Sequence, residues 1–217
     1  MRHRRVILTT STILVATLIV GVVVITRFRH NSPHYFLPVA TTRNIVTKTL
    51  ANPSKVPPTA STYTSAAAPN EPSYISLPTI GAKGYMQKVG VDQYGQMAAP
   101  TNVHLAGWYV NSLLPGQAGL SIIDGHIDGS LHNQGIFGQL SKLKVGDVFT
   151  ITFGNGSSKS FAVKSLQSVV ANDVPSVLFA HDPAISSQLN LITCSGNYDG
   201  VSHTYDKRTV VIGAAIP

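Results

Sequence analysis

The feature that most constrains the fold is the division of residues 73–217 into short apolar runs separated by Gly, Pro and Asn. This pattern is typical of strands joined by turns. Two segments, 136–143 and 174–179, can form short helices, the second with Pro175 in its first turn. Eight strands with little helix predict an all-β domain, a closed barrel or a sandwich. The predicted strands are residues 74–77, 86–91, 103–108, 120–124, 148–153, 160–170, 189–193 and 209–214.

A second feature is an uncharged apolar run at residues 6–26. At helical rise this run is long enough to cross the hydrocarbon core of a bilayer. A helix in a soluble core rarely stays apolar on all its sides. A cleaved signal peptide usually has a shorter apolar region that ends in small residues, whereas this run ends at Thr26-Arg27. We therefore predict an uncleaved transmembrane signal anchor at 6–26.

The flanks of this run predict its orientation. Basic residues lie on both sides, with slightly more of them before the run, so we expect residues 1–5 to be a cytoplasmic tail. Residues 27–72 are rich in Pro, Ser, Thr and Ala and poor in large apolar side chains, which predicts a flexible extracellular linker. The expected arrangement is a single-pass membrane protein whose folded domain, 73–217, lies outside the cell.

The net charge of +7 first suggests a nucleic-acid partner. Its distribution argues against one. Residues 1–72 contain eight Lys or Arg and one acid, Glu71, whereas residues 73–217 contain eight basic and eight acidic residues. The folded domain therefore carries no overall charge that would attract phosphate, and we expect no nucleic-acid binding.

Three residues beside strand ends are candidates for chemistry. Cys194 is the only cysteine, so no disulfide can form within the chain, and it directly follows the apolar run that ends at Thr193. His126 follows an apolar run and Gly125. Arg208 opens the last apolar run, and it falls at the same end of the sheet as Cys194 if the last two strands pair antiparallel. Each residue alone also fits an ordinary structural role: a buried thiol, a surface histidine, or a cation paired with Asp199 or Asp206.

The combination of these three side chains is suited to acyl transfer. A thiol attacks as its thiolate, and a free cysteine with a pKa near ~8.5 is mostly protonated at neutral pH. A nearby cation stabilises the thiolate, and a guanidinium can also donate to the oxyanion that forms during the reaction. Histidine can protonate the leaving amine near neutral pH. Cys194, His126 and Arg208 thus form a minimal set for cysteine acyl transfer.

These residues resemble the sortase family over nearly the whole region 75–217. The sortase pattern T-L-x-T-C, followed by a strand that begins with arginine, matches residues 190–194 and 208–211, except that Asn190 replaces the first Thr. Further short motifs resemble class F sortases first and class E second: ISLPTIG at 75–81, Trp108-Tyr109, Pro115-Gly116 and IFGQLSKLKVGD at 136–147.

The resemblance implies an eight-stranded sortase-type β-barrel of a membrane-tethered bacterial cysteine transpeptidase. Such an enzyme cleaves an LPxTG-like sorting signal of an exported protein between Thr and Gly, holds the Thr as a thioester, and transfers it to an amine of a cell-wall precursor or a pilin lysine. By position, Cys194 is the nucleophile, His126 the general acid and base, and Arg208 the stabiliser of oxyanion and substrate. Thr193 helps to position the substrate. No cofactor is implied, and the scattered acids predict no calcium site.

Three alternatives remain open at this level. A β-domain on a membrane-tethered stalk could be a surface-binding module without enzymatic activity. In that case the function of the protein would not change in Cys194→Ala. A zinc site could use His126, His132, Cys194 and His203, although their spacing matches no short ligand motif. An L,D-transpeptidase also uses cysteine and histidine, but its Ser-x-Gly-Cys signature is absent before Cys194.

Overall fold

The computed structural model describes residues 67–129 and 134–217. The predicted cytoplasmic tail and membrane anchor lie outside these residues, as does the predicted linker up to residue 66. Within the described ranges no helix has the length and apolar character needed to cross a membrane.

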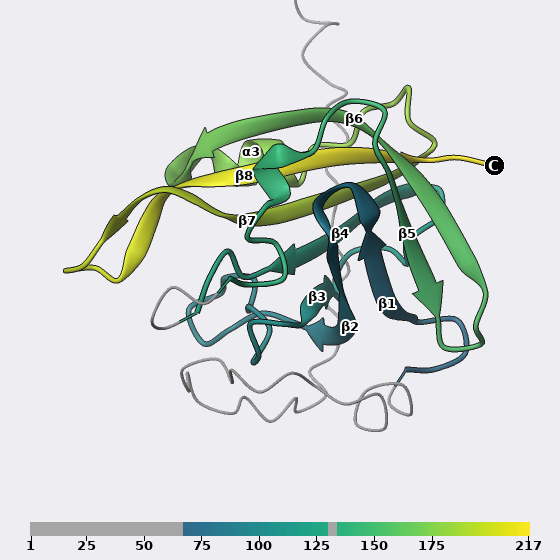
Figure 1. The fold of residues 1–217 in the computed structure, drawn as a ribbon, viewed down its shortest axis with the longest axis horizontal. Helices are drawn as coiled ribbons and strands as arrows, with labels where there is room; N and C mark the ends of the chain where they lie inside the picture. The colour runs from purple at the N-terminus through teal and green to yellow at the C-terminus, as the bar shows by residue number, and fades with distance from the viewer. Residues whose placement is uncertain (1–66, 130–133) are drawn as a thin grey trace, which may run out of the picture. The chain divides into compact units, whose positions relative to one another are not determined.

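Eight strands close into a single β-barrel in the order β1-β2-β3-β4-β7-β8-β6-β5 (Figure 1). Six neighbouring pairs are antiparallel, while β2 pairs with β3 and β4 pairs with β7 in parallel. The prediction of an eight-stranded all-β barrel with short helices is confirmed. The strands are β1 (Pro72–Leu77), β2 (Ala82–Val89), β3 (Ala106–Tyr109), β4 (Gly119–Gly125), β5 (Val148–Phe153), β6 (Ser158–Val170), β7 (Ser187–Asp199) and β8 (Thr204–Ala215).

In the described part of the chain, the helical segments are short and lie between strands. The helix predicted at 174–179 is present as α3 (Val174–Leu178), with Pro175 in its first turn. The helix predicted at 136–143 is reduced to one 3-10 turn, η3 (Leu140–Lys142). Two further 3-10 turns were not predicted, η1 (Pro78–Ile80) and η4 (Ala171–Asp173).

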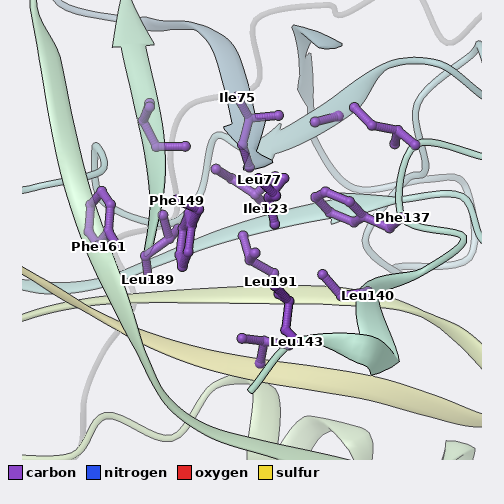
Figure 2. Packing of buried hydrophobic residues seen from close by; sticks show 14 of the residues in the cluster. Ile75, Leu77, Ile123, Phe137, Leu140, Leu143, Phe149, Phe161, Leu189 and Leu191 are labelled. Atoms are coloured by element: carbon purple, nitrogen blue, oxygen red, sulfur yellow. The ribbon is translucent and has the colours of Figure 1, made fainter. Parts of the chain in front are cut away.

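The barrel interior holds the larger of two hydrophobic clusters. Phe137, Phe149 and Phe161 are fully buried there, and the rings of Phe149 and Phe161 stack with centroids 5.5 Å apart. Leu189 and Leu191 of β7 belong to the same cluster as Ile75 and Leu77 of β1, and Figure 2 shows Leu189 next to Phe149. Because successive strand residues face opposite sides, Ile192 must point the other way.

The second cluster lies on that other side of the strands. It contains Ile122 of β4, Val169 of β6, Ile192 of β7 and Val210 of β8, covered by Leu178 of α3. The segment between β6 and β7, which includes α3, is thus packed on the outer face of the barrel. Alternation along β7 and β8 places Cys194 and Arg208 on this outer face too, two residues beyond Ile192 and before Val210.

Candidate active site

The surroundings of Cys194 differ from the sequence-based prediction in one respect. The predicted strand ended at residue 193, but β7 continues through Ser195-Gly196-Asn197 to Asp199. The chain accommodates this run as a bulge between Ser195 and Tyr198. Gly196 has a φ of 85°, and Asp206 accepts hydrogen bonds from the backbone N–H of Asn197 at 2.7 Å and from its side-chain amide at 3.2 Å. Cys194 therefore lies within a stretch of β7 that pairs with β8 both before and after it, through Thr193 and Ser195.

Arg208 is the direct partner of Cys194 across the β7–β8 pair. Residues opposite each other in an antiparallel pair lie on the same face, so the thiol and the guanidinium stem are neighbours. The Arg208 Nη1 donates to the carbonyl oxygens of Tyr205 and Lys207, each at 2.8 Å. The alternative role of Arg208 as a cation paired with Asp199 or Asp206 is not supported. Asp206 binds Asn197, and Asp199 binds Val201 and Ser202.

His126 lies at the same end of the barrel, on the other side of β7. β4 and β7 run parallel with Asp124 beside Ile192. The hydroxyl of Thr193 continues this contact by donating to the carbonyl oxygen of Gly125 at 2.7 Å. The residue before His126 is thus bonded to the residue before Cys194. The structure therefore brings His126, Cys194 and Arg208 to one end of three adjacent strands.

The orientation of the imidazole is set by a backbone carbonyl. The Nε2 of His126 lies 2.7 Å from the carbonyl oxygen of Pro100, and a carbonyl only accepts, so Nε2 carries the hydrogen. The segment around Pro100 is itself anchored, because Gln87 of β2 accepts bonds from the backbone and the hydroxyl of Thr101, each at 3.0 Å. Nδ1 is then the ring nitrogen available for taking up and releasing a proton.

The thiol of Cys194 is partly buried, and burial raises its pKa above the usual value for cysteine. The Arg208 guanidinium opposes this effect and lowers the pKa, whereas the carboxyl groups of Asp128 and Asp124 raise it further. The resting thiol is therefore mostly protonated at neutral pH. A base is needed when it attacks, which is the task a neighbouring histidine can perform.

Asp124 is a buried acid that the sequence analysis did not single out. It is 8% exposed, and burial raises its pKa well above the ordinary value. Among the described residues, no hydrogen-bond partner lies within reach of its Oδ1. The partner residue on β3 is Gly107, and a Cβ there would collide with this same oxygen, so the glycine makes room for the acid.

Asn190, the departure from the T-L-x-T-C pattern, has a defined contact. It is fully buried, and its side-chain amide donates to the carbonyl oxygen of Leu178 at 2.7 Å while accepting from Gln188 at 2.9 Å. Gln188 in turn donates to the Ala180 carbonyl oxygen and accepts from the N–H of Asp182. These two amides tie the end of α3 to the outer face. The signal was visible in the sequence as two polar residues alternating within an apolar strand.

Thr193 was predicted to help position substrate. Its side chain is 5% exposed and its hydroxyl is bonded to Gly125. The contacts therefore give it a role in holding the segment that carries His126.

No three His, Cys, Asp or Glu side chains within 67–129 and 134–217 gather as a metal site, and His132 of the zinc alternative lies outside the described residues.

Comparison with known proteins identifies the family. The family model described as the Sortase domain matches residues 75–216, which is more than half of the chain. The chain belongs to the sortase family. No curated protein sequence matches it. Sortase A from Corynebacterium diphtheriae is similar in structure at 25% identity and a TM-score of 0.51, with 70% of this chain and 63% of that chain covered. The lid mutant of that protein gives 26% identity, a TM-score of 0.53, and 70% and 74% coverage.

The family and the fold together make this chain a sortase-type cysteine transpeptidase in general terms. Within this sortase domain, Cys194 is the only thiol, so a cysteine-dependent reaction has one available nucleophile.

Proposed function

We propose that this sortase is a membrane-anchored transpeptidase that cleaves an LPxTG-like sorting signal and transfers the acyl part to an amine on the cell wall or a pilin. The observation that carries the proposal is the register of the sheet. Cys194 pairs with Arg208 on one side, and the Thr193–Gly125 bond places the segment of His126 on the other. The motifs shared with class F sortases make that class our first assignment and class E the second.

The proposed reaction uses these three side chains in order. His126 takes the proton of the Cys194 thiol, and the thiolate attacks the carbonyl carbon of the Thr in the signal. Arg208 donates to the oxyanion that forms. The C–N bond to Gly breaks, His126 protonates the departing amine, and a thioester remains. An acceptor amine then attacks the carbonyl carbon of the thioester, and the C–S bond breaks. The proton lost by the amine passes through His126 to the departing Cys194 thiolate, which restores the thiol.

The test is to incubate the full-length chain with a panel of LPxTG, LAxTG and related peptides, with and without an amine, and to analyse the mixture by mass spectrometry. We expect an acyl adduct on Cys194 and, with the amine, a transpeptidation product. Cys194→Ala should form neither. A wild-type chain that forms no adduct with any peptide, while its thiol remains intact, would contradict the proposed reaction.

We also propose the membrane arrangement: residues 1–5 in the cytoplasm, 6–26 as the anchor, 27–72 as the linker and 73–217 outside. The apolar run and its flanking charges support it. Because Cys194 is the only cysteine, a membrane-impermeant maleimide applied to intact cells should label the chain. Labelling only after the cells are lysed would place the domain on the cytoplasmic side.

A further inference from the structure

The nucleophile strand is flanked by two separate segments that must stay in register for the proposed chemistry. β7 lies between β4 and β8 in the barrel. Arg208 is on β8, while His126 and Asp128 follow the end of β4. Cys194 is between them, so a link from the β4 side to the β8 side must span the end of the catalytic strand.

Tyr205 makes such a link. Its hydroxyl donates to Asp128 Oδ2 at 2.6 Å, a contact between residues 77 apart in the sequence. Its carbonyl oxygen accepts from Nη1 of Arg208 at 2.8 Å. One residue is therefore bonded to the candidate arginine through its backbone and to the segment of the candidate histidine through its side chain.

The backbone of the His126 segment is held by the residues before η3. The His126 carbonyl accepts from the N–H of Phe137 at 3.0 Å, and the Ile127 carbonyl accepts from the N–H of Gly135 at 2.9 Å. The ring is held by Pro100. The contact with Tyr205 adds a restraint from β8, the strand that carries the guanidinium.

We propose that Tyr205 is a positioning residue, and that its hydrogen bond to Asp128, the Tyr205–Asp128 clasp, fixes the spacing of the His126 and Arg208 segments on either side of Cys194. The proposal rests on the roles given to these three residues under the proposed function. The clasp itself touches neither substrate nor reacting atoms. Its effect is to keep the guanidinium beside the thiol and the imidazole segment at a constant distance from both.

The two members of the clasp have different electrostatic roles: Tyr205 stays a neutral hydrogen-bond donor, whereas Asp128 acts on the thiol pKa. The pKa of Tyr205 is raised to about 12, first by burial and then by Asp128, so its hydroxyl remains a donor at every pH at which the enzyme would work. Five groups at this end of the barrel bear on the thiol or adjoin it: Arg208 and Tyr205 on β8, Asp124 on β4, and His126 and Asp128 after it. Asp128 raises the thiol pKa and Arg208 lowers it.

Two conservative variants of the full-length chain test the clasp, with the rate of Cys194 alkylation by iodoacetamide measured across pH. Tyr205→Phe keeps the ring, the Asp128 charge and the backbone bond to Arg208, but removes the bond to Asp128. The β8 segment that carries Arg208 then loses its tie to the His126 segment, so the guanidinium should be held less firmly beside the thiol and the alkylation profile should move to higher pH. Asp128→Asn keeps an acceptor for the hydroxyl but removes the charge, so the profile should move to lower pH. Turnover of a cleaved sorting peptide should fall about tenfold in kcat for Tyr205→Phe, with KM little changed.

Tyr198→Phe is the matched control. Tyr198 lies on the same hairpin, with its ring 5.2 Å from that of Tyr205, but its hydroxyl is bonded to His203 instead, at 3.1 Å. We expect it to behave as the wild type. A Tyr205→Phe variant indistinguishable from Tyr198→Phe, or one whose profile moves in the same direction as that of Asp128→Asn, would overturn the clasp. If no peptide is cleaved by the wild type, the proposed function fails, but the alkylation comparison still decides the clasp.

Discussion

The two faces of β7 show how one strand serves both stability and chemistry. On the inner face, Leu189 and Leu191 are fully buried among aromatic and aliphatic side chains. On the outer face, Gln188, Asn190, Ile192 and Cys194 follow one another, and only Ile192 is apolar. The inner face buries apolar surface. The free energy gained from this burial is roughly proportional to the buried area and does not depend on particular polar groups. The outer face depends on particular hydrogen bonds and charges.

The difference teaches how the nucleophile is kept in place. A loop residue would owe its position to local contacts, whereas Cys194 is fixed by a strand whose other face is part of the barrel core. The β7–β8 hairpin extends beyond the barrel at the left of Figure 1. The bulge at Gly196 separates this extension from the regular register that holds Cys194 opposite Arg208. We expect truncation of an inner-face side chain to lower stability, whereas replacement of Cys194 on the outer face should remove activity.

The largest effect should come from the outer face. Cys194→Ala removes the only thiol and should abolish formation of the acyl adduct and of the transpeptidation product, measured by mass spectrometry. Because the side chain lies outside the interior cluster, the midpoint of thermal unfolding should change little. A variant with unaltered transpeptidation would show that the outer face of β7 does not carry the nucleophile.

Leu191→Ala tests the inner face. It should lower the free energy of unfolding by about 2–5 kcal/mol, since it leaves a cavity in a close-packed interior. Urea denaturation followed by circular dichroism measures this change. Leu113→Ala is the control, because Leu113 is 41% exposed and the same truncation should cost far less there. Equal losses for the two leucines would mean that the inner face is not the stabilising one.

Asp124→Asn addresses a buried acid near the outer face. Because the folded-state pKa of Asp124 is raised, the folded chain binds more protons than the unfolded chain above pH ~4. The acid therefore contributes most stability at low pH and loses it as pH rises toward the folded-state pKa, by about 1.4 kcal/mol for each unit of pKa difference. The variant should lack this decline in urea denaturation from pH 4 to 8. A wild type whose stability has the same pH slope as the variant would contradict the assignment.

The smallest effect should follow from Asn190→Ala. It leaves the Leu178 carbonyl oxygen without its bond from β7, which should lower the free energy of unfolding by about 1–3 kcal/mol. It should also speed amide hydrogen exchange in α3 and the residues after it, because that segment loses a tie to the barrel. Gln167→Ala, on an exposed position of β6, is the matched amide control. Unchanged exchange after α3 would remove Asn190 from this role.

The pattern of apolar runs determined most of the fold. The predicted strand 148–153 has the bounds of β5, and the others overlap the observed strands, because alternation and turn residues are local signals. The end of β7 was predicted wrongly. Gly196 beside Asn197 favours a turn when only the local sequence is considered. Here the carboxylate of Asp206, on the neighbouring strand, accepts a hydrogen bond from the Asn197 N–H and so stabilises a bulge within β7.

By itself the sequence determined the strands and the three residue types suited to acyl transfer, since both depend on side-chain chemistry written in the chain. Only the tertiary structure decided that Pro100 offers a carbonyl to His126, that Asp124 is buried opposite Gly107, and that Tyr205 bonds Asp128. A backbone carbonyl is present in every residue, so the sequence does not mark which one will bind a side chain. Contacts between residues far apart in the sequence form only when the barrel closes, because its packing offsets the entropy lost in bringing them together.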